Sequence, residues 1–271
     1  MKRHVDSLSR SEEHNSRGME LADRGWLEEA EKEFRKAIDL DPRSSDAHAN
    51  LATVHAQKKR WREAAAEYLT ALTLDPDGAT AHFNLGLFLS AHGLDMAIEE
   101  YRRAIELEPD QADAHLELGL VYSDQGRLEE ARAELNAAIG LAPDDPLPHH
   151  ELAALAMDEG DFRVAIGHLK TVVRLAPEDF DAWLDLGIAY AQKGFFGQAE
   201  RAYDRARALD GDQLLVEYNR AGLYALWGRP AEAIAALRQA VDRDARKVRG
   251  WLRSDPTFDW LRGNPELEAL L

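Results

Sequence analysis

A proline recurs along this chain at nearly constant intervals, and this spacing limits the folds that the chain can adopt. The prolines at 42, 76, 109, 143 and 177 are separated by 34, 33, 34 and 34 residues. Each one ends a stretch in which apolar residues recur three and four positions apart, the period of an amphipathic helix. Because a fixed period of this length is the signature of a repeat architecture, we predict a stack of similar helical repeats.

Each repeat contains the signals for two helices. A glycine near the middle, such as Gly126, supplies the left-handed residue that ends the first helix. Lys59 stands at this place in the second repeat, and Gly93 in the third, which is one residue shorter. A following Glu-Ala, Gln-Ala or Met-Ala pair begins the second helix, with an alanine small enough for close helix crossing, and the proline stops it because proline lacks a backbone N–H. The resulting repeats are 11–44, 45–78, 79–111, 112–145, 146–179, 180–213 and a degenerate 214–247.

The apolar and small residues follow one pattern in every repeat, shown in the sixth by Trp183, Leu186, Gly187, Tyr190, Gly194, Ala199, Tyr203 and Ala206. This pattern resembles the tetratricopeptide repeat (TPR), and the resemblance covers about residues 11–247. It implies an all-α fold, a right-handed α-solenoid superhelix of stacked antiparallel helix pairs. The first repeat departs from the pattern with Arg17 in place of leucine, and the last two have Gly211 and Ala245 in place of the terminal proline.

The two ends of the chain leave the repeat pattern. Residues 1–10 are polar and charged, and we expect them to be flexible. Residues 248–271 are apolar, and we expect a C-terminal helical cap with two short helices, because Asp255 and Asn264 each place a capping side chain before a proline. The alternative is that Trp251 and Trp260 form an exposed patch for a partner or for a second copy of the chain.

The charge of the chain excludes several classes of partner. The chain has 33 lysines and arginines and 50 aspartates and glutamates. The resulting net charge of −17 repels nucleic acid and anionic lipid. The absence of cysteine excludes disulfides, thiolate zinc sites and cysteine nucleophiles. No apolar run reaches the ~18–20 residues of a spanning helix, and no signal peptide is evident. We therefore expect a cytoplasmic protein that binds no nucleic acid and inserts into no membrane.

Histidine occupies one position in five successive repeats, a pattern that raises the question of a metal site. Neighbouring helices lie ~8–10 Å apart, whereas zinc holds its ligands at ~2.0–2.1 Å, so equivalent histidines cannot share an ion. We expect each ring to pack its body and leave its polar tip in water. No phosphate-binding loop or nucleophile elbow occurs either, so the sequence predicts no cofactor, no metal and no enzyme. The series is His14, His48, His82, His115 and His149, with Trp183 in the sixth repeat.

The TPR resemblance implies a concave groove lined by the first helix of each repeat, in which extended peptides bind. Six positions per repeat, the second, fifth, sixth, ninth, twelfth and thirteenth, turn inward in that family. None of these forty-two positions holds lysine or arginine, and ten hold aspartate or glutamate. A groove that grips a carboxylate needs charged donors, so we expect no carboxylate clamp.

The inward positions predict the residues of a partner-binding groove. Asparagine amides can pair with a peptide backbone, and the carboxylates can accept from peptide N–H groups, lysine or arginine. The predicted set is Asn50, Phe83, Asn84, Leu87, Leu116, Glu117, Leu120, Asp124, His150, Glu151, Asp158, Asp185, Tyr218 and Asn219. We expect a protein-interaction adaptor that binds an extended or helical, basic or amphipathic segment of another protein. The alternative is a self-associating scaffold, a homo-oligomer that assembles through its ends and recruits other proteins.

Overall fold

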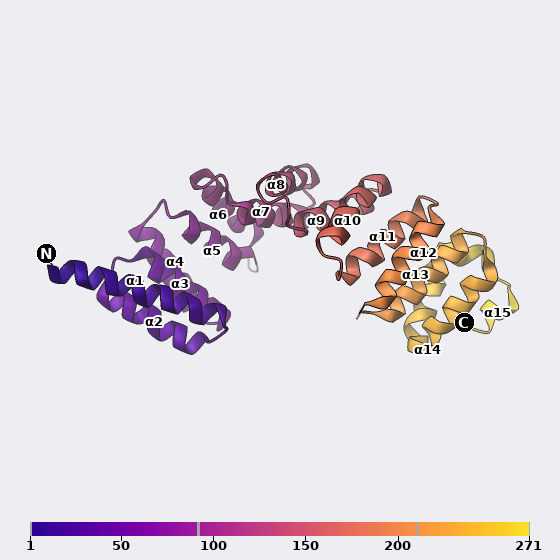
Figure 1. Ribbon diagram of the computed structural model, residues 1–271, viewed down its shortest axis with the longest axis horizontal. Helices are drawn as coiled ribbons and strands as arrows, with labels where there is room; N and C mark the ends of the chain where they lie inside the picture. The colour runs from indigo at the N-terminus through magenta and orange to yellow at the C-terminus, as the bar shows by residue number, and fades with distance from the viewer. Residues whose placement is uncertain (1, 91–92, 210, 271) are drawn as a thin grey trace. The chain divides into compact units, whose positions relative to one another are not determined.

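The computed structural model describes residues 2–90, 93–209 and 211–270, and over these ranges it consists of helices and the turns between them (Figure 1). Seven consecutive helix pairs are followed by a 3-10 helix, η1, and a single helical turn, α15. The helices are α1 (Lys2–Asp23), α2 (Leu27–Leu40), α3 (Ser45–Gln57), α4 (Trp61–Leu74), α5 (Ala79–Ser90), α6 (Leu94–Leu107), α7 (Ala112–Asp124), α8 (Leu128–Leu141), α9 (Leu147–Asp158), α10 (Phe162–Leu175), α11 (Phe180–Gln192), α12 (Phe196–Ala208), α13 (Gln213–Leu226), α14 (Pro230–Ser254), η1 (Pro256–Leu261) and α15 (Pro265–Glu268).

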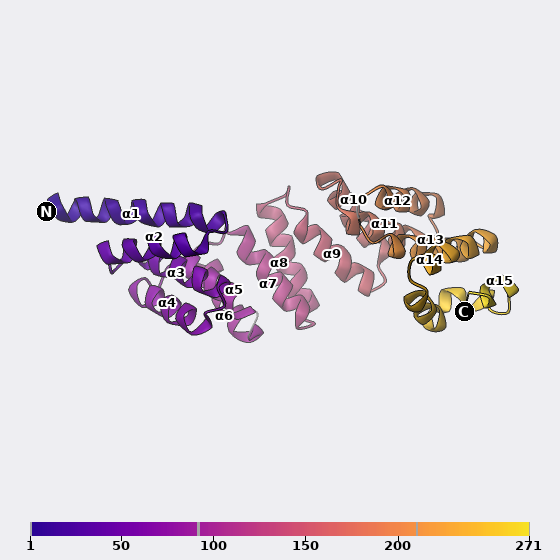
Figure 2. The same ribbon diagram turned by 90° about the horizontal axis from the view of Figure 1, so that it is seen from below.

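The chain divides into two compact bodies, the N-terminal body at residues 1–143 and the C-terminal body at residues 144–271. In the N-terminal body each first helix packs against its own second helix, and α2, α4 and α6 also pack against the first helix of the next repeat (Figure 2). The first helices α1, α3, α5 and α7 contact one another in succession. They form one continuous side of this body, which we call the first-helix face.

The C-terminal body repeats this arrangement with α9 to α14. Helices α11 and α13 contact each other and form its first-helix face, and η1 packs on α13. Helix α14 contains a kink at Asp244, where the backbone leaves helical geometry (φ −152°, ψ 89°), and the Asp244 carboxylate accepts from the Lys247 N–H at 3.0 Å. The part of α14 beyond the kink begins the C-terminal extension. Its buried side chains pack with those of α13 and the first half of α14, and they include Leu252, Phe258, Leu261 and Leu267.

The turns inside the repeats follow their sequence signals with one exception. The glycines at 25, 126, 160, 194 and 228 have φ between 71° and 76°, and Lys59 takes the same left-handed conformation at 58°. The expectation for Gly93 is wrong: its φ of −177° is extended, and it is the residue that precedes α6. The third repeat is one residue shorter, so its turn is built differently. The two residues before Gly93 lie outside the described ranges.

Small residues allow the helices of each pair to cross closely. The alanine near the start of each of the seven second helices is fully buried, at 0% exposure in every repeat. On the first helix, a Cβ added at Gly86 would lie 2.7 Å from the Tyr101 ring. Because real Cβ atoms do not approach a ring this closely, the Leu-Gly pair of the repeat is required by packing against the aromatic residue of the second helix.

The first helix begins earlier than the sequence predicted. Helix α1 starts at Lys2 and includes most of the segment that we expected to be flexible. Two of its serines bind the end of α2: Ser7 Oγ donates to the Leu40 carbonyl at 2.9 Å, and Ser11 Oγ donates to the Ala37 carbonyl at 2.8 Å. These side-chain bonds hold the first turns of α1 beside α2, so residues 7–10 belong to the folded first repeat.

The serial histidines form hydrogen bonds where we had expected their tips to be in water. In the first four repeats Nδ1 lies 2.5 to 2.7 Å from the carboxylate of a glutamate on the second helix, namely Glu33, Glu67, Glu100 and Glu134. His82 and His115 also point Nε2 at a turn carbonyl 3.1 Å away, and the Trp183 indole N–H donates to the equivalent carbonyl of Pro177 at 3.0 Å. The rings therefore tie the two helices of a repeat and the preceding turn together.

Candidate functional site

The N-terminal body brings eight of the predicted groove residues to its first-helix face, but at different depths. Leu87 and Asp124 are exposed, whereas Asn50, Phe83, Asn84, Glu117 and Leu120 are half-buried. Leu116 is only 7% exposed, so it packs beneath the surface and supports its neighbours. The surface that a ligand can reach in this body is therefore centred on α3, α5 and α7, with Leu116 below it.

Two asparagines of successive repeats are linked on this face. The Asn50 amide Nδ2 donates to the Asn15 Oδ1 at 3.0 Å, from α3 to α1. This bond orients both amides and leaves the Asn50 oxygen as an acceptor and the Asn15 NH2 group as a donor for a ligand. Such a pair is suited to a peptide bond, which offers one donor and one acceptor. Asn15 occupies an inward position, but sequence reasoning did not select it.

Glu117 on α7 is a carboxylate in an unfavourable setting. Its burial raises the pKa of the carboxyl group, and the carboxylate of Asp113, one turn earlier, raises it further, while the nearby Tyr101 hydroxyl offsets part of this rise. Within the described ranges no lysine, arginine or histidine forms an ion pair with Glu117. A cation on a ligand would stabilise the ionised Glu117 carboxylate and so offset the effect of burial and of Asp113. Glu117 is therefore the acid of this body that a bound basic group would stabilise most.

An apolar pocket opens beside Asn84, between α3, α4 and α5. It has a volume of about 280 Å³, and aromatic rings form much of its wall. The Phe88 ring lies 5.7 Å from Tyr68 and 6.2 Å from Trp61, centroid to centroid. We call it the aromatic pocket; its lining is Thr53, Ala56, Gln57, Trp61, Tyr68, Asn84, Leu87 and Phe88. A pocket of this size and polarity accepts one apolar side chain.

The C-terminal body pairs one of the predicted acids internally. His150 Nε2 on α9 lies 3.3 Å from the Asp185 Oδ2 on α11, and this hydrogen bond raises the pKa of the imidazole. Asp185 is therefore already partnered in the free protein, in contrast to Glu117. Of the remaining predicted residues here, Glu151, Tyr218 and Asn219 are half-buried and Asp158 is exposed.

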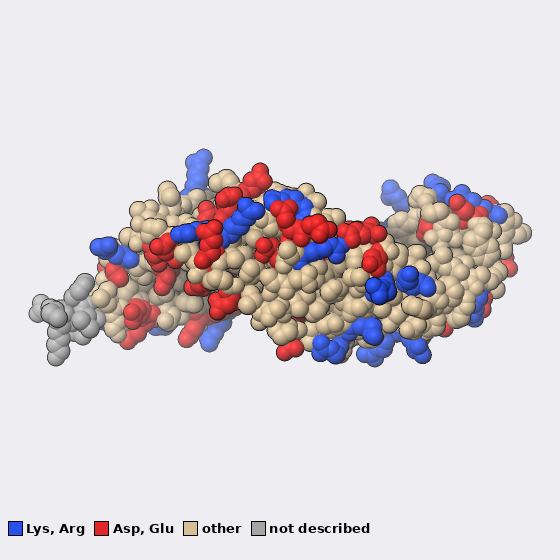
Figure 3. All heavy atoms as spheres, turned by 90° about the horizontal axis from the view of Figure 1, so that it is seen from above, with Lys and Arg blue, Asp and Glu red and all other residues tan. Residues whose placement is uncertain are grey.

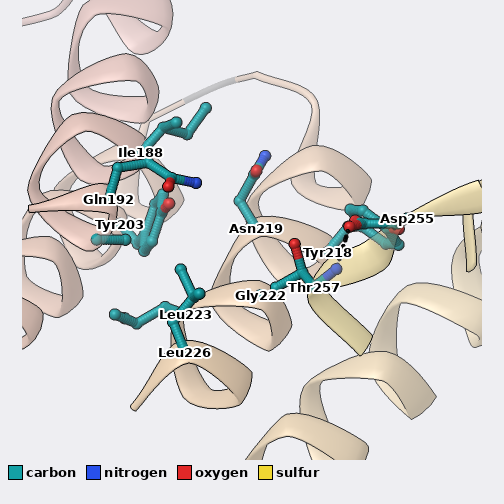
Figure 4. A pocket seen from close by; sticks show the side chains of 11 residues that line it. Ile188, Gln192, Tyr203, Tyr218, Asn219, Gly222, Leu223, Leu226, Asp255 and Thr257 are labelled. Carbon is teal, nitrogen blue, oxygen red and sulfur yellow. Dashed lines mark hydrogen bonds between the residues drawn. The ribbon is translucent and has the colours of Figure 1, made fainter. Parts of the chain in front are cut away.

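A second pocket lies on the first-helix face of the C-terminal body and is closed on one side by the extension. It has a volume of about 160 Å³. Figure 4 shows Ile188, Gln192 and Tyr203 reaching in from α11 and α12, with Tyr218, Asp255 and Thr257 on the opposite side. The Tyr218 hydroxyl donates to the Asp255 carboxylate at 2.9 Å, and Asn219 Nδ2 donates to the Leu215 carbonyl at 2.9 Å. We call it the C-terminal pocket.

The two pockets occupy the same place in the repeat pattern. Each is lined by a glutamine at the thirteenth position of one repeat, the alanine before it, the tyrosine of the second helix and the asparagine at the sixth position of the next repeat. The two sets are Ala56, Gln57, Tyr68 and Asn84, and Ala191, Gln192, Tyr203 and Asn219. Sequence reasoning selected the asparagines and missed the glutamines and tyrosines. The signal was present: these are the two places in the chain where a glutamine, a tyrosine and an asparagine coincide at these positions.

The described residues hold no arrangement that would bind a metal ion, since no three histidine, aspartate or glutamate side chains converge among them. Over the same ranges, no helix is both long enough and apolar enough to cross a membrane. Acidic side chains outnumber basic ones in the chain. On the face drawn in Figure 3 they gather over the left and middle of the view, and basic side chains are more frequent toward the right.

Comparisons with known proteins identify the repeats. Models of the tetratricopeptide repeat match residues 14–44, 87–146, 150–213 and 185–248, and a TPR repeat model matches residues 54–93. No match was found among curated protein sequences.

Solved structures show the same fold at low sequence identity. The C-terminal part of a TPR repeat-containing protein from Cytophaga hutchinsonii superposes with a TM-score of 0.69 at 18% identity, over 86% of this chain and 97% of the other. PilF of Pseudomonas aeruginosa gives 0.64 at 19%, over 81% and 97%. YrrB, described as a TPR protein with an unusual peptide-binding site, gives 0.57 at 24%, over 68% and 95%. The family models match more than half of the chain, and the chain therefore belongs to the tetratricopeptide repeat family.

Proposed function

We propose that this protein is a non-catalytic interaction adaptor whose first-helix face binds a basic or amphipathic segment of a partner protein. TPR domains are in general protein-interaction modules, and YrrB is an example with a peptide-binding site. The observation that carries the proposal is the charge of the inward positions, ten acids and no base, combined with the half-buried carboxylate of Glu117, which forms no ion pair among the residues that the structure describes.

The charge argument is strongest in the N-terminal body. A carboxylate that is half-buried beside another carboxylate is destabilised. An ammonium or guanidinium group that approaches it places a positive charge next to it and stabilises the ionised form. Asp185 in the C-terminal body is already paired with His150, so it has less to gain from a ligand. We therefore assign the principal cation contact to Glu117 in the N-terminal body. Glu151 is a separate and weaker candidate in the C-terminal body, where Asp185 is available when His150 is neutral.

Backbone and apolar contacts complete the proposed site. The linked amides of Asn15 and Asn50 can hold a peptide bond of any sequence, and the aromatic pocket can take one apolar side chain of the ligand. These features lie on α1, α3 and α5, and Glu117 lies on α7, so a ligand that crosses these helices in succession meets all of them. The ligand chemistry that fits is an apolar anchor followed by a basic residue.

Site-specific photocrosslinking tests this proposal in a lysate of the native host. A photoreactive phenylalanine analogue at Leu87 places the reactive group at the aromatic pocket, and the same analogue at the exposed Asn136 of α8 serves as the control on a second helix. We expect a protein that is crosslinked from position 87 and not from position 136, through a segment that contains lysine or arginine beside an apolar residue.

Two results would overturn the proposal. One is that both positions capture the same proteins, which would mean that binding does not involve the first-helix face. The other is that the crosslinked segments from position 87 are acidic or lack basic residues, which would mean that the charge of this face does not select the partner.

Self-association is a second candidate, favoured by the exposure of Trp260, which is 54% exposed on the C-terminal extension although its neighbours Phe258 and Leu261 are buried. An exposed tryptophan beside a buried cluster is a typical contact residue. Light scattering decides this point, since a mass that stays monomeric at all concentrations excludes the scaffold. The cytoplasmic location remains a prediction from the sequence.

A further inference from the structure

The other side of the C-terminal body carries a pocket that the proposed function does not use. It lies between α10, α11 and α12 and has a volume of about 410 Å³. Its apolar wall includes Val173, Trp183 and Tyr190, and three basic side chains surround it, namely Lys170, Arg201 and Arg205. We call it the outer pocket. A cluster of three bases around an apolar pocket is unusual in a chain with a net charge of −17.

The outer pocket lies where the repeat pattern changes. In the first four repeats, a histidine on the first helix pairs with a glutamate on the second, as in His48 with Glu67 at 2.6 Å. In the sixth repeat the corresponding residues are Trp183 and Ala202, which is 2% exposed. Alanine removes both the volume and the negative charge of the glutamate, so the indole ring borders an open space and the nearby bases lose an internal counter-charge.

The bases of the outer pocket remain available for a ligand. Within the described ranges, none of Lys170, Arg201 and Arg205 takes part in an ion pair. The Arg205 guanidinium lies 5.5 Å from the centroid of the Trp183 ring, which holds it over the pocket by a cation–π interaction. The indole N–H donates to the Pro177 carbonyl at 3.0 Å and fixes the ring. Trp183 and Arg205 are therefore positioned before any ligand binds.

We propose that the outer pocket binds an acidic segment of a partner protein, with an apolar side chain in the pocket and carboxylates on the surrounding bases. Arg201 and Arg205 are four residues apart on α12, a rise of about 6 Å. Carboxylates two residues apart on an extended peptide are separated by about 6.6 Å, which matches this spacing. A single phosphate group is smaller than this distance, so the spread of the bases favours a peptide with alternating acids.

Fluorescence anisotropy with a defined probe tests this inference. The probe is a fluorescein-labelled, acetylated peptide in which glutamate alternates with leucine and phenylalanine, and its control replaces every glutamate by glutamine. At about 50 mM salt we expect the acidic probe to bind the full chain and the glutamine probe to bind at least fivefold more weakly. The Arg201→Gln/Arg205→Gln variant should bind the acidic probe at least fivefold more weakly than the wild type.

A matched variant controls for overall charge. Arg243→Gln/Lys247→Gln removes two exposed bases, also four residues apart, from α14. We expect it to bind the acidic probe as the wild type does; an equal loss in both double variants would overturn the proposal, because it would show only long-range attraction.

A second variant tests the repeat comparison. Ala202→Glu restores the glutamate of the first four repeats, and we expect it to abolish binding of the acidic probe while circular dichroism confirms that the chain is folded. If Ala202→Glu does not fold, the arginine variant decides alone. Equal affinity for the acidic and glutamine probes, or displacement of the acidic probe by inorganic phosphate below millimolar concentration, would contradict the peptide site.

Discussion

Replacement of Glu117 by glutamine should stabilise the protein and weaken its binding of a basic ligand. The pKa of the Glu117 carboxyl is raised by burial and by Asp113, so the ionised form destabilises the folded state at neutral pH. Glutamine keeps the size and an acceptor oxygen but removes the charge. A residue whose removal raises stability and lowers affinity is retained for binding, a known trade-off at functional sites.

The size of the effect follows from the contacts of Glu117. The like charge of Asp113, four residues earlier on α7, contributes about 0.2–0.5 kcal/mol of repulsion. Relief of the burial cost adds to this, so we expect the free energy of unfolding to rise by about 0.5–1 kcal/mol at pH 7. For a chain of this size the corresponding rise in Tm is about 1–4 °C.

The pH dependence gives the sharper test. An acid whose folded-state pKa lies above its unfolded value destabilises the fold above that pKa, and the cost disappears when pH falls below the unfolded value. The advantage of Glu117→Gln should therefore be present at pH 7 and absent near pH 4. Urea unfolding followed by circular dichroism at both pH values measures it, with the exposed turn residue Asp110→Asn as the control expected to stay within about 0.5 kcal/mol of the wild type at pH 7. A glutamine variant that is less stable than the wild type at pH 7, or equally shifted at both pH values, would refute the reasoning.

Three further predictions follow from single contacts. His150→Gln should lower stability by about 0.5–1 kcal/mol at pH 5 and leave it unchanged at pH 8, because the raised pKa of His150 beside Asp185 gives a stabilising pair only while the imidazole is protonated; urea unfolding at the two pH values checks this. Gly86→Ala should lower the free energy of unfolding by about 1–3 kcal/mol, because its Cβ would lie 2.7 Å from the Tyr101 ring. Gly140→Ala on α8 meets open space and should raise the free energy of unfolding by about 0.5–1 kcal/mol. Thermal unfolding of the two variants gives the comparison. Leu87→Ala removes an exposed side chain from the wall of the aromatic pocket. It should weaken the binding of a ligand with an apolar anchor about three- to tenfold and change Tm by less than about 2 °C. A binding titration and a melting curve measure the two effects.

The helices and most turns could be predicted from the sequence because their signals are local. Proline follows the second helix in the first five repeats, and a left-handed residue ends the first helix in six repeats, so even Lys59 could be assigned its conformation from its place in the repeat. Gly93 shows where this reasoning fails. A one-residue deletion leaves the glycine in place but changes the backbone path around it, and the type of residue alone does not reveal that change.

The side-chain pairs could not be predicted in the same way, because they join residues on different helices. His48 and Glu67 are 19 residues apart, and their contact depends on how the two helices cross. The same is true of His150 and Asp185, which both appeared among the predicted groove residues but as separate binding groups. The charge of the first-helix face was evident from the sequence. The structure was needed to distinguish Asp185, which lies beside His150, from Glu117, which forms no ion pair within the described ranges.

The pockets could not be predicted from the sequence either, because they too are formed by residues on different helices. Asn84 and Asn219 were selected for their amides, but the pockets beside them are formed with Gln57, Tyr68, Gln192 and Tyr203, from the repeat before. The outer pocket depends on the loss of one glutamate at Ala202, which is visible in the sequence only once the histidine and glutamate pairs of the earlier repeats are known.

The central claim, that the first-helix face of the N-terminal body selects a basic ligand through Glu117, is tested most directly by fluorescence anisotropy with a labelled peptide in which lysine alternates with leucine. We predict that the wild type binds this peptide and that Glu117→Lys binds it at least tenfold more weakly, whereas Asp110→Lys, with the same change of charge on an exposed turn, loses less than threefold. Equal losses in the two variants, or no loss in Glu117→Lys, would contradict the account.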